Sequence, residues 1–105
     1  MAYQNFTDVI ASEIEARLPE ISALNKHIHA NPELAYEEHK AHDAFVSTLT
    51  ALGFKVTPHA YGIPTSFVAE FGSGGRLITF NAEYDALPEI GHACGHNLIA
   101  SSSLA

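Results

Sequence analysis

The residues with the clearest potential for chemistry lie between positions 85 and 96. Cys94, the single cysteine of the chain, stands two residues before His96, and His92 stands two residues before Cys94. Thiolates and imidazoles are both good zinc ligands, and a two-residue spacing in an extended segment points side chains to one side. Gly95 lets the backbone turn sharply between the two. One divalent ion could therefore be held by both Cys94 and His96.

Carboxylates upstream extend this candidate site. Asp85 follows the end of an apolar run, which is the usual place for a site carboxylate in an open α/β sheet. Glu83 would share its side in an extended segment and could line a pocket. The residue types leave alternatives open: a buried thiol for Cys94, a loop cap for Asp85 and loop packing for His92. Two ligands also fall short of the roughly three protein ligands of a catalytic zinc.

Two stretches of the sequence resemble a known family. They are Glu-Tyr-Asp-Ala-Leu-Pro-Glu-Ile-Gly-His-Ala-Cys-Gly-His-Asn-Leu at 83–98 and His-Ala-Asn-Pro-Glu-Leu-Ala-Tyr-Glu-Glu at 29–38. Together they resemble the N-terminal part of the aminoacylase/carboxypeptidase-type metallopeptidases, the twentieth metallopeptidase family, in its amidohydrolase subfamily. Gly-His-Asn at 95–97 is similar to the branch of p-aminobenzoyl-glutamate hydrolase and the β-alanyl dipeptidases, since other members more often carry Asp after this His. The resemblance begins at about residue 20.

This resemblance implies an activity and roles for residues. Full-length relatives hydrolyse amide bonds with two divalent metals in an α/β catalytic domain, and an inserted lid domain mediates homodimerisation. Carried onto this chain, Cys94 and His96 are metal ligands, and Asp85 orients an imidazole ligand and raises its basicity. Glu83 and His92 are placed near the pocket without being ligands. A thiolate ligand favours zinc, with manganese as the alternative.

Other acidic and histidine pairs are interpreted more simply. The family's Glu-Glu pair of base and ligand lies downstream of the Cys-Gly-His motif, so Glu37 and Glu38 are interpreted as a solvated helical face. His39 and His42 stand three apart on a predicted helix, where they could share a metal. Their polar neighbours favour solvent exposure instead.

The whole chain, 1–105, is expected to be the N-terminal segment of such a catalytic domain, without the lid. The parent protein would hydrolyse an amide bond of an N-acyl or aminoacyl amino acid or dipeptide, while the isolated segment is expected to be inactive and to bind metal weakly. The alternative is a non-catalytic truncated paralogue that acts as an interaction module through an uncovered sheet face. A Cys94 nucleophile is disfavoured, because nothing places a His–Asn or His–Asp pair to activate it.

Composition narrows the partners and the compartment. Twelve acidic against five basic residues give a net charge of −7, which argues against nucleic acid and anionic membranes as partners. No apolar run reaches the roughly 18 residues of a membrane span, and the first residues lack the pattern of a signal peptide. A single cysteine forms no internal disulfide, so a cytoplasmic protein is expected.

Hydrophobic periodicity predicts two helices. Apolar residues at steps of three and four predict a helix from about residue 8 to residue 30, with a kink at Pro19 between nearly collinear halves. Asn31-Pro32 should end it. A second helix is predicted from 32–33 to Leu52, with Gly53 as its left-handed stop. Its buried stripe would consist of Ala41, Phe45, Leu49 and Leu52.

Beyond residue 53 the period changes to that of strands. Strands are predicted at 54–57, 66–71 and 76–82, the last two joined as a hairpin through the glycine-rich 72–75. A third helix should start at Leu98, with Asn97 as its cap. The nearly continuous apolar run at 76–82 indicates a strand covered on both faces. The predicted fold is therefore α/β, the N-terminal part of a three-layer zinc-peptidase domain with an incompletely covered sheet.

Overall fold

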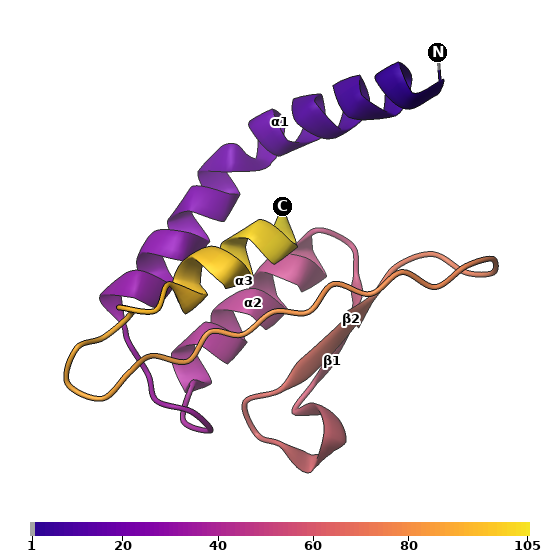
Figure 1. Ribbon diagram of the computed structural model, residues 1–105. Helices are drawn as coiled ribbons and strands as arrows, with labels where there is room; N and C mark the ends of the chain where they lie inside the picture. The colour runs from indigo at the N-terminus through magenta and orange to yellow at the C-terminus, as the bar shows by residue number, and fades with distance from the viewer. Residues whose placement is uncertain (1) are drawn as a thin grey trace.

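The computed structural model describes residues 2–105, which form three α-helices, a two-stranded sheet and one 3-10 turn. In chain order these are α1 (Ala2–Ala30), α2 (His39–Ala51), β1 (Lys55–Pro58), the 3-10 turn (Ala60–Gly62), β2 (Phe67–Glu70) and α3 (His96–Leu104). Figure 1 shows α2 and α3 beside the lower half of α1, with the short sheet next to α2. The predicted α/β class is confirmed.

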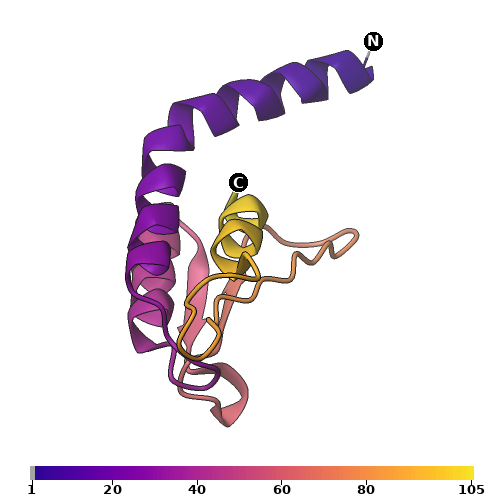
Figure 2. The ribbon, with the colours of Figure 1, turned by 60° about the vertical axis from the view of Figure 1, so that its left-hand side comes forward.

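Helix α1 is bent, as the proline inside it predicts. Pro19 lies within α1, and Figure 2 shows the helix turning sharply near its middle. A proline removes a backbone donor and crowds the preceding turn, which explains the kink. The expectation of nearly collinear halves is wrong. The bend carries the first half away from α2 and α3, so Ile10 and Leu18 are exposed while Leu24 and Ile28 are buried.

The ends of the first two helices agree with their sequence signals. Helix α1 stops at Ala30, directly before Asn31-Pro32, and α2 stops at Ala51, one residue before the predicted end. Gly53 then adopts a φ of 96°, the left-handed conformation that glycine tolerates best. Within residues 2–105, no helix has the length and apolar character needed to cross a membrane.

The start of α2 differs from the prediction. The helix begins at His39 rather than at 32–33, and the preceding segment is irregular. The carboxylate of Glu33 accepts hydrogen bonds from the backbone N–H groups of Lys40 and Ala41, each at 2.9 Å. First-turn N–H groups have no partner within their own helix. Glu33 therefore caps α2 from outside, where the sequence pattern suggested that it belonged to the helix.

Strands β1 and β2 pair antiparallel, with Lys55 opposite Glu70 and Pro58 opposite Phe67. They confirm the predicted strands at 54–57 and 66–71 to within a residue or so at each end. Helix α2 packs against both strands and α1 packs against α2 and α3. The helices thus cover the sheet through α2.

The predicted third strand and its hairpin are wrong. Residues 71–83 form an exposed irregular segment, in which Leu77, Ile78 and Phe80 are 88%, 70% and 77% exposed. Strand β2 pairs with β1, and within residues 2–105 no strand pairs with 76–82. A run this apolar is typical of an interior strand, which needs neighbours at both edges. Without them the segment stays in solvent.

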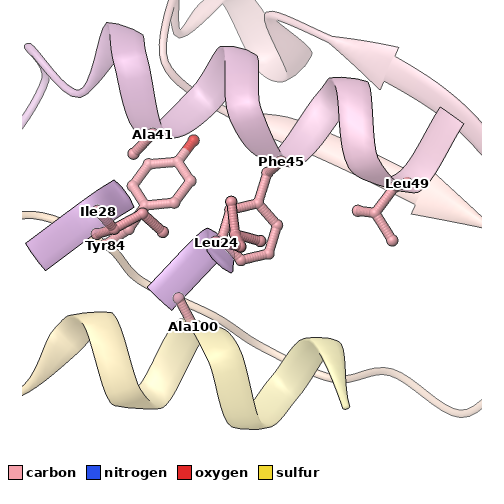
Figure 3. Packing of buried hydrophobic residues seen from close by; sticks show 7 residues of the cluster. All are labelled: Leu24, Ile28, Ala41, Phe45, Leu49, Tyr84 and Ala100. Atoms are coloured by element: carbon pink, nitrogen blue, oxygen red, sulfur yellow. The ribbon is translucent and has the colours of Figure 1, made fainter. Parts of the chain in front are cut away.

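The core gathers side chains from all three helices and from the segment before α3. Its seven buried members, shown in Figure 3, are Leu24, Ile28, Ala41, Phe45, Leu49, Tyr84 and Ala100. Three of the four residues in the predicted α2 stripe are among them, while Leu52 is half-buried. Tyr84, a member of this core, is the residue directly before Asp85. The candidate site is thus attached to the best-packed part of the molecule.

Candidate metal site

Asp85 and His96 lie together although eleven residues separate them. The Asp85 carboxylate oxygen Oδ1 is 2.7 Å from the imidazole Nδ1 of His96, and the side chains are 30% and 24% exposed. The residues beside Asp85, Tyr84 and Ala86, are 7% and 4% exposed. A carboxylate in this position accepts a hydrogen bond from Nδ1–H and leaves Nε2 available for another partner. The pair is therefore partly exposed at the surface, while the two residues that flank Asp85 are buried.

Helix α3 supplies His96 as its first residue. Gly95 is the N-cap and has a φ of 81°, so the chain turns into the helix through a conformation that suits glycine. The predicted start at Leu98 with Asn97 as the cap is wrong. Asn97 lies inside the first turn, is 5% exposed, and donates from Nδ2 to Oδ1 of Asn25 in α1 at 2.8 Å. This contact ties the first turn of α3 to α1.

Cys94 stands one residue before the cap of α3 and is a free, exposed cysteine. A structural zinc or a buried thiol would leave the sulfur covered, and a buried thiol was one of the alternatives that the sequence left open. Exposure makes the thiol accessible to an ion or a ligand. Within the described part of the chain, no group of three or more His, Cys, Asp and Glu side chains is arranged to hold a metal ion.

His92 lies beside this pair in an unusual environment. Both of its ring nitrogens are buried and have no hydrogen-bond partner among the described residues. Its ring stacks on that of His29 with centroids 6.3 Å apart. Burial lowers the pKa of His92, and the neighbouring His29 and His96 lower it further, while the nearby Ile28 backbone and the Asp85 carboxylate oppose this shift. The ring of His92 thus lies between His29, near the end of α1, and the candidate site, with a lowered pKa.

The remaining residues considered from sequence have different surroundings. Glu83 is exposed and belongs to the irregular segment. His39 is exposed as expected, but His42 is 2% exposed, a departure from prediction. His42 lies 2.9 Å from Asp43 through Nδ1, accepts a hydrogen bond at Nε2 from the His59 N–H, and stacks on the His59 ring at 4.6 Å. It is a packed and satisfied histidine.

The interpretation of Glu37 and Glu38 as a helical face is also wrong. Both precede α2, and Glu38 is its half-buried N-cap residue. Its Oε1 accepts a hydrogen bond at 2.9 Å from the hydroxyl of Thr65, which is 4% exposed. The sequence pattern missed this role because the partner is 27 residues away.

A shallow apolar groove lies next to the candidate site. It runs between the segment after α1 and the loop that leads to Cys94, and Gly91 lies close to Pro32 across it. Its lining residues are Pro32, Leu34, Ala86, Leu87, Pro88, Glu89 and Gly91. A backbone bridge between Leu87 and Gly91 closes the loop on itself. The groove gives the site an apolar wall.

Comparison with known proteins places these features in a family. No family profile matches the chain. The chain is 42% identical to Xaa-Arg dipeptidase of Mus musculus over 90% of its own length and 24% of the relative's length. It is 33% identical to a p-aminobenzoyl-glutamate hydrolase polypeptide of Escherichia coli (strain K12), over 91% of this chain and 24% of the relative. It is 31% identical to thermostable carboxypeptidase 2 of Saccharolobus solfataricus, over 73% of this chain and 23% of the relative.

The chain spans about a quarter of the length of these curated relatives. Most of its own length is covered in each case, and all three relatives are hydrolases of peptide or amide substrates by name. The resemblance noted at 29–38 and 83–98 agrees with them. The chain belongs to the amidohydrolase and peptidase family that these proteins represent, the twentieth metallopeptidase family.

Proposed function

We propose that this chain is the N-terminal part of the catalytic domain of a metal-dependent amidohydrolase or dipeptidase. Cys94 and His96 are its contribution to the divalent metal site, and Asp85 orients His96. The observation that carries the proposal is the 2.7 Å contact between Asp85 and His96, which follows the exposed, free Cys94 by two residues in the chain. The name Xaa-Arg dipeptidase supports an aminoacyl amino acid as the substrate, and the name p-aminobenzoyl-glutamate hydrolase supports an N-acyl amino acid.

The side chains of Cys94 and His96 are of types that bind a divalent ion. A carboxylate bound to Nδ1 of His96 selects the tautomer that leaves Nε2 unprotonated, which is the form that ligates metal. The thiol of Cys94 is accessible and becomes a good ligand as a thiolate. When bound, the ion would acidify a coordinated water and polarise a carbonyl. The thiolate favours zinc, and manganese is the alternative.

Two protein ligands predict weak metal binding by these 105 residues, because catalytic zinc sites use about three. The family resemblance implies that the other ligands, a Glu acting as base and the lid that mediates homodimerisation belong to the rest of a longer protein. We therefore expect these residues alone to lack turnover. A single cysteine supports a reducing compartment, the cytoplasm, for the protein.

A metal titration tests the ligand assignment. Cobalt(II) added to the purified chain should give a thiolate-to-metal absorption band, and this band should disappear in Cys94→Ser. His96→Ala should weaken cobalt binding, whereas His27→Ala, at an exposed histidine of α1, should leave it unchanged. Equal cobalt binding by the wild type, Cys94→Ser and His96→Ala would refute the site.

An activity assay tests the inactive-segment part separately. The purified chain is offered Xaa-Arg dipeptides, N-acyl amino acids and p-aminobenzoyl-glutamate with zinc or manganese. No turnover is expected. Chelator-sensitive turnover by the 105-residue chain would contradict the inactive segment while supporting the hydrolase assignment.

The second candidate is a non-catalytic interaction module. The observation in its favour is the exposed apolar run of Leu77, Ile78 and Phe80, since a patch of this kind usually marks an interface. Such a module would pair with a full-length relative through this segment. Co-sedimentation of the purified chain with a purified full-length homologue would support it. A coding sequence that continues past Ala105 into a Glu-Glu pair and further histidines would favour the enzyme.

A further inference from the structure

Tyr84 and Ala86, the two residues that flank Asp85, are buried, whereas the segment that leads to them is exposed. Residues 71–83 are exposed throughout, and the burial begins abruptly at Tyr84. Consecutive Cα atoms lie about 3.8 Å apart, so anchors on both sides of Asp85 leave its backbone little freedom. Two such anchors exist, and both lead to residues 29–38, which we call the bracing segment.

The first anchor is the side chain of Tyr84. Its ring packs in the core against Phe45 and Phe67, with centroids 5.7 and 6.3 Å away. Its hydroxyl donates a hydrogen bond to the backbone carbonyl of Thr65. The Thr65 hydroxyl in turn donates to Glu38 of the bracing segment at 2.9 Å. The chain of contacts thus runs from Glu38 through Thr65 to the residue beside Asp85.

The second anchor is the backbone of Ala86. Its N–H donates to the backbone carbonyl of Glu33 at 2.7 Å, and Ala86 itself is 4% exposed. Glu33 is fixed in turn, because its carboxylate caps the N–H groups of Lys40 and Ala41 in α2. Residue 85 is therefore held between two anchored neighbours. Both anchors lead through hydrogen bonds to the start of α2, one through its N-cap residue Glu38 and the other through Glu33.

We propose that Tyr84, Thr65 and Glu38 are positioning residues that hold the Asp85 carboxylate against His96. Any effect of these residues on hydrolysis rests on the proposed function. Their effect on the Asp85–His96 contact does not. A misplacement of about 1 Å weakens a hydrogen bond strongly and degrades the geometry of a site. The bracing segment thus acts on the candidate site without touching its ligands.

The experiment reads the tautomer of His96 from the nitrogen-15 shifts of its ring in the purified, metal-free protein, above the pH at which imidazoles titrate. The wild type should show a predominantly Nδ1-protonated ring. In Tyr84→Phe and Thr65→Val, the population should move towards the Nε2-protonated tautomer that free imidazoles favour. Tyr84→Phe keeps the ring in the core, so loss of the fold is not the expected cause.

Matched variants separate positioning from general stability. Glu38→Gln keeps an acceptor for the Thr65 hydroxyl and should resemble the wild type, whereas Glu38→Ala should resemble Thr65→Val. Leu49→Val loosens the same core at a residue outside the contacts around Asp85, so it should lower stability and leave the His96 tautomer unchanged. An unchanged tautomer in Tyr84→Phe, Thr65→Val and Glu38→Ala would overturn the assignment. So would an equal tautomer change in Leu49→Val. Failure of metal binding or turnover leaves this readout intact, so the two proposals fail separately.

Discussion

Oδ1 of Asp85 lies 2.7 Å from Nδ1 of His96, which joins the end of an exposed segment to the first residue of α3. The contact occupies Nδ1 of His96 and leaves Nε2 free to bind another partner, such as a metal ion. The relationship brings together two residues from different parts of the family motif, and the first prediction follows from it.

Replacing the Asp85 carboxylate by an amide should weaken metal binding. Asp85→Asn keeps the shape of the side chain but removes the charge that stabilises the metal-binding tautomer. Loss of such a partner typically costs about 10- to 100-fold in metal affinity. Cobalt or zinc titration by calorimetry measures the change, with Glu83→Gln, at an exposed neighbouring carboxylate, as the control. Wild-type affinity in Asp85→Asn would argue against the orienting role.

Tyr84 should make the fold sensitive to alkali. Burial raises the pKa of its hydroxyl, and the nearby charges of Glu38, Glu33 and Asp43 raise it further. The folded state therefore retains the Tyr84 proton more tightly than the unfolded state. Its stabilising contribution is complete below the unfolded pKa of about 10 and is lost as pH rises beyond that value.

The measurement compares urea unfolding at neutral and alkaline pH. Tyr84→Phe should be less sensitive to alkali than the wild type, because it lacks this ionisable hydroxyl. Tyr61→Phe, at a residue 85% exposed, serves as the control and should follow the wild type. Equal alkaline losses in wild type and Tyr84→Phe would contradict the prediction.

The cap supplied by Glu33 should contribute measurably to stability. Glu33→Ala leaves the first-turn N–H groups of Lys40 and Ala41 without their carboxylate partner, so we expect a loss of about 0.5–2 kcal/mol in the free energy of unfolding. Glu37→Ala removes an exposed acidic side chain nearby and should change little. Chemical denaturation followed by circular dichroism compares the two variants, and equal losses in both would exclude the cap.

The two halves of α1 should respond differently to the same truncation. Ile28 is 1% exposed in the core, so Ile28→Ala should cost about 2–5 kcal/mol. Ile10 is 58% exposed in the first half, and Ile10→Ala should stay within about 0.5 kcal/mol. Thermal or chemical unfolding of both variants checks this difference. Similar losses would mean that the first half of α1 is packed in solution.

The exposed apolar run should promote self-association. Leu77→Lys or Phe80→Lys places a charge in a segment that is otherwise a hydrophobic patch. Either change should lower the aggregated fraction seen by light scattering, while Ser73→Lys, in the same exposed segment, should lower it less. An equal effect of all three would attribute the gain to charge alone.

The sequence by itself was sufficient for features that depend on neighbouring residues. Asn31-Pro32 marked the end of α1, Gly53 followed the end of α2, and Pro19 marked the kink. Each of these signals acts through local backbone geometry, which the chain carries with it. The motifs at 29–38 and 83–98 likewise identified the family, later supported by the comparison with known proteins.

Tertiary contacts decided the rest. The apolar pattern of 76–82 could not show that no strand among residues 2–105 pairs with this segment, since strand formation requires hydrogen bonds from outside it. Glu33 and Glu38 read as helical residues until their partners at Ala41 and Thr65 were known. The proximity of Asp85 to His96 and of His92 to His29 also depends on how α1, α2 and α3 pack. Local spacing set which residues were available for a site, and long-range packing determined which of them meet.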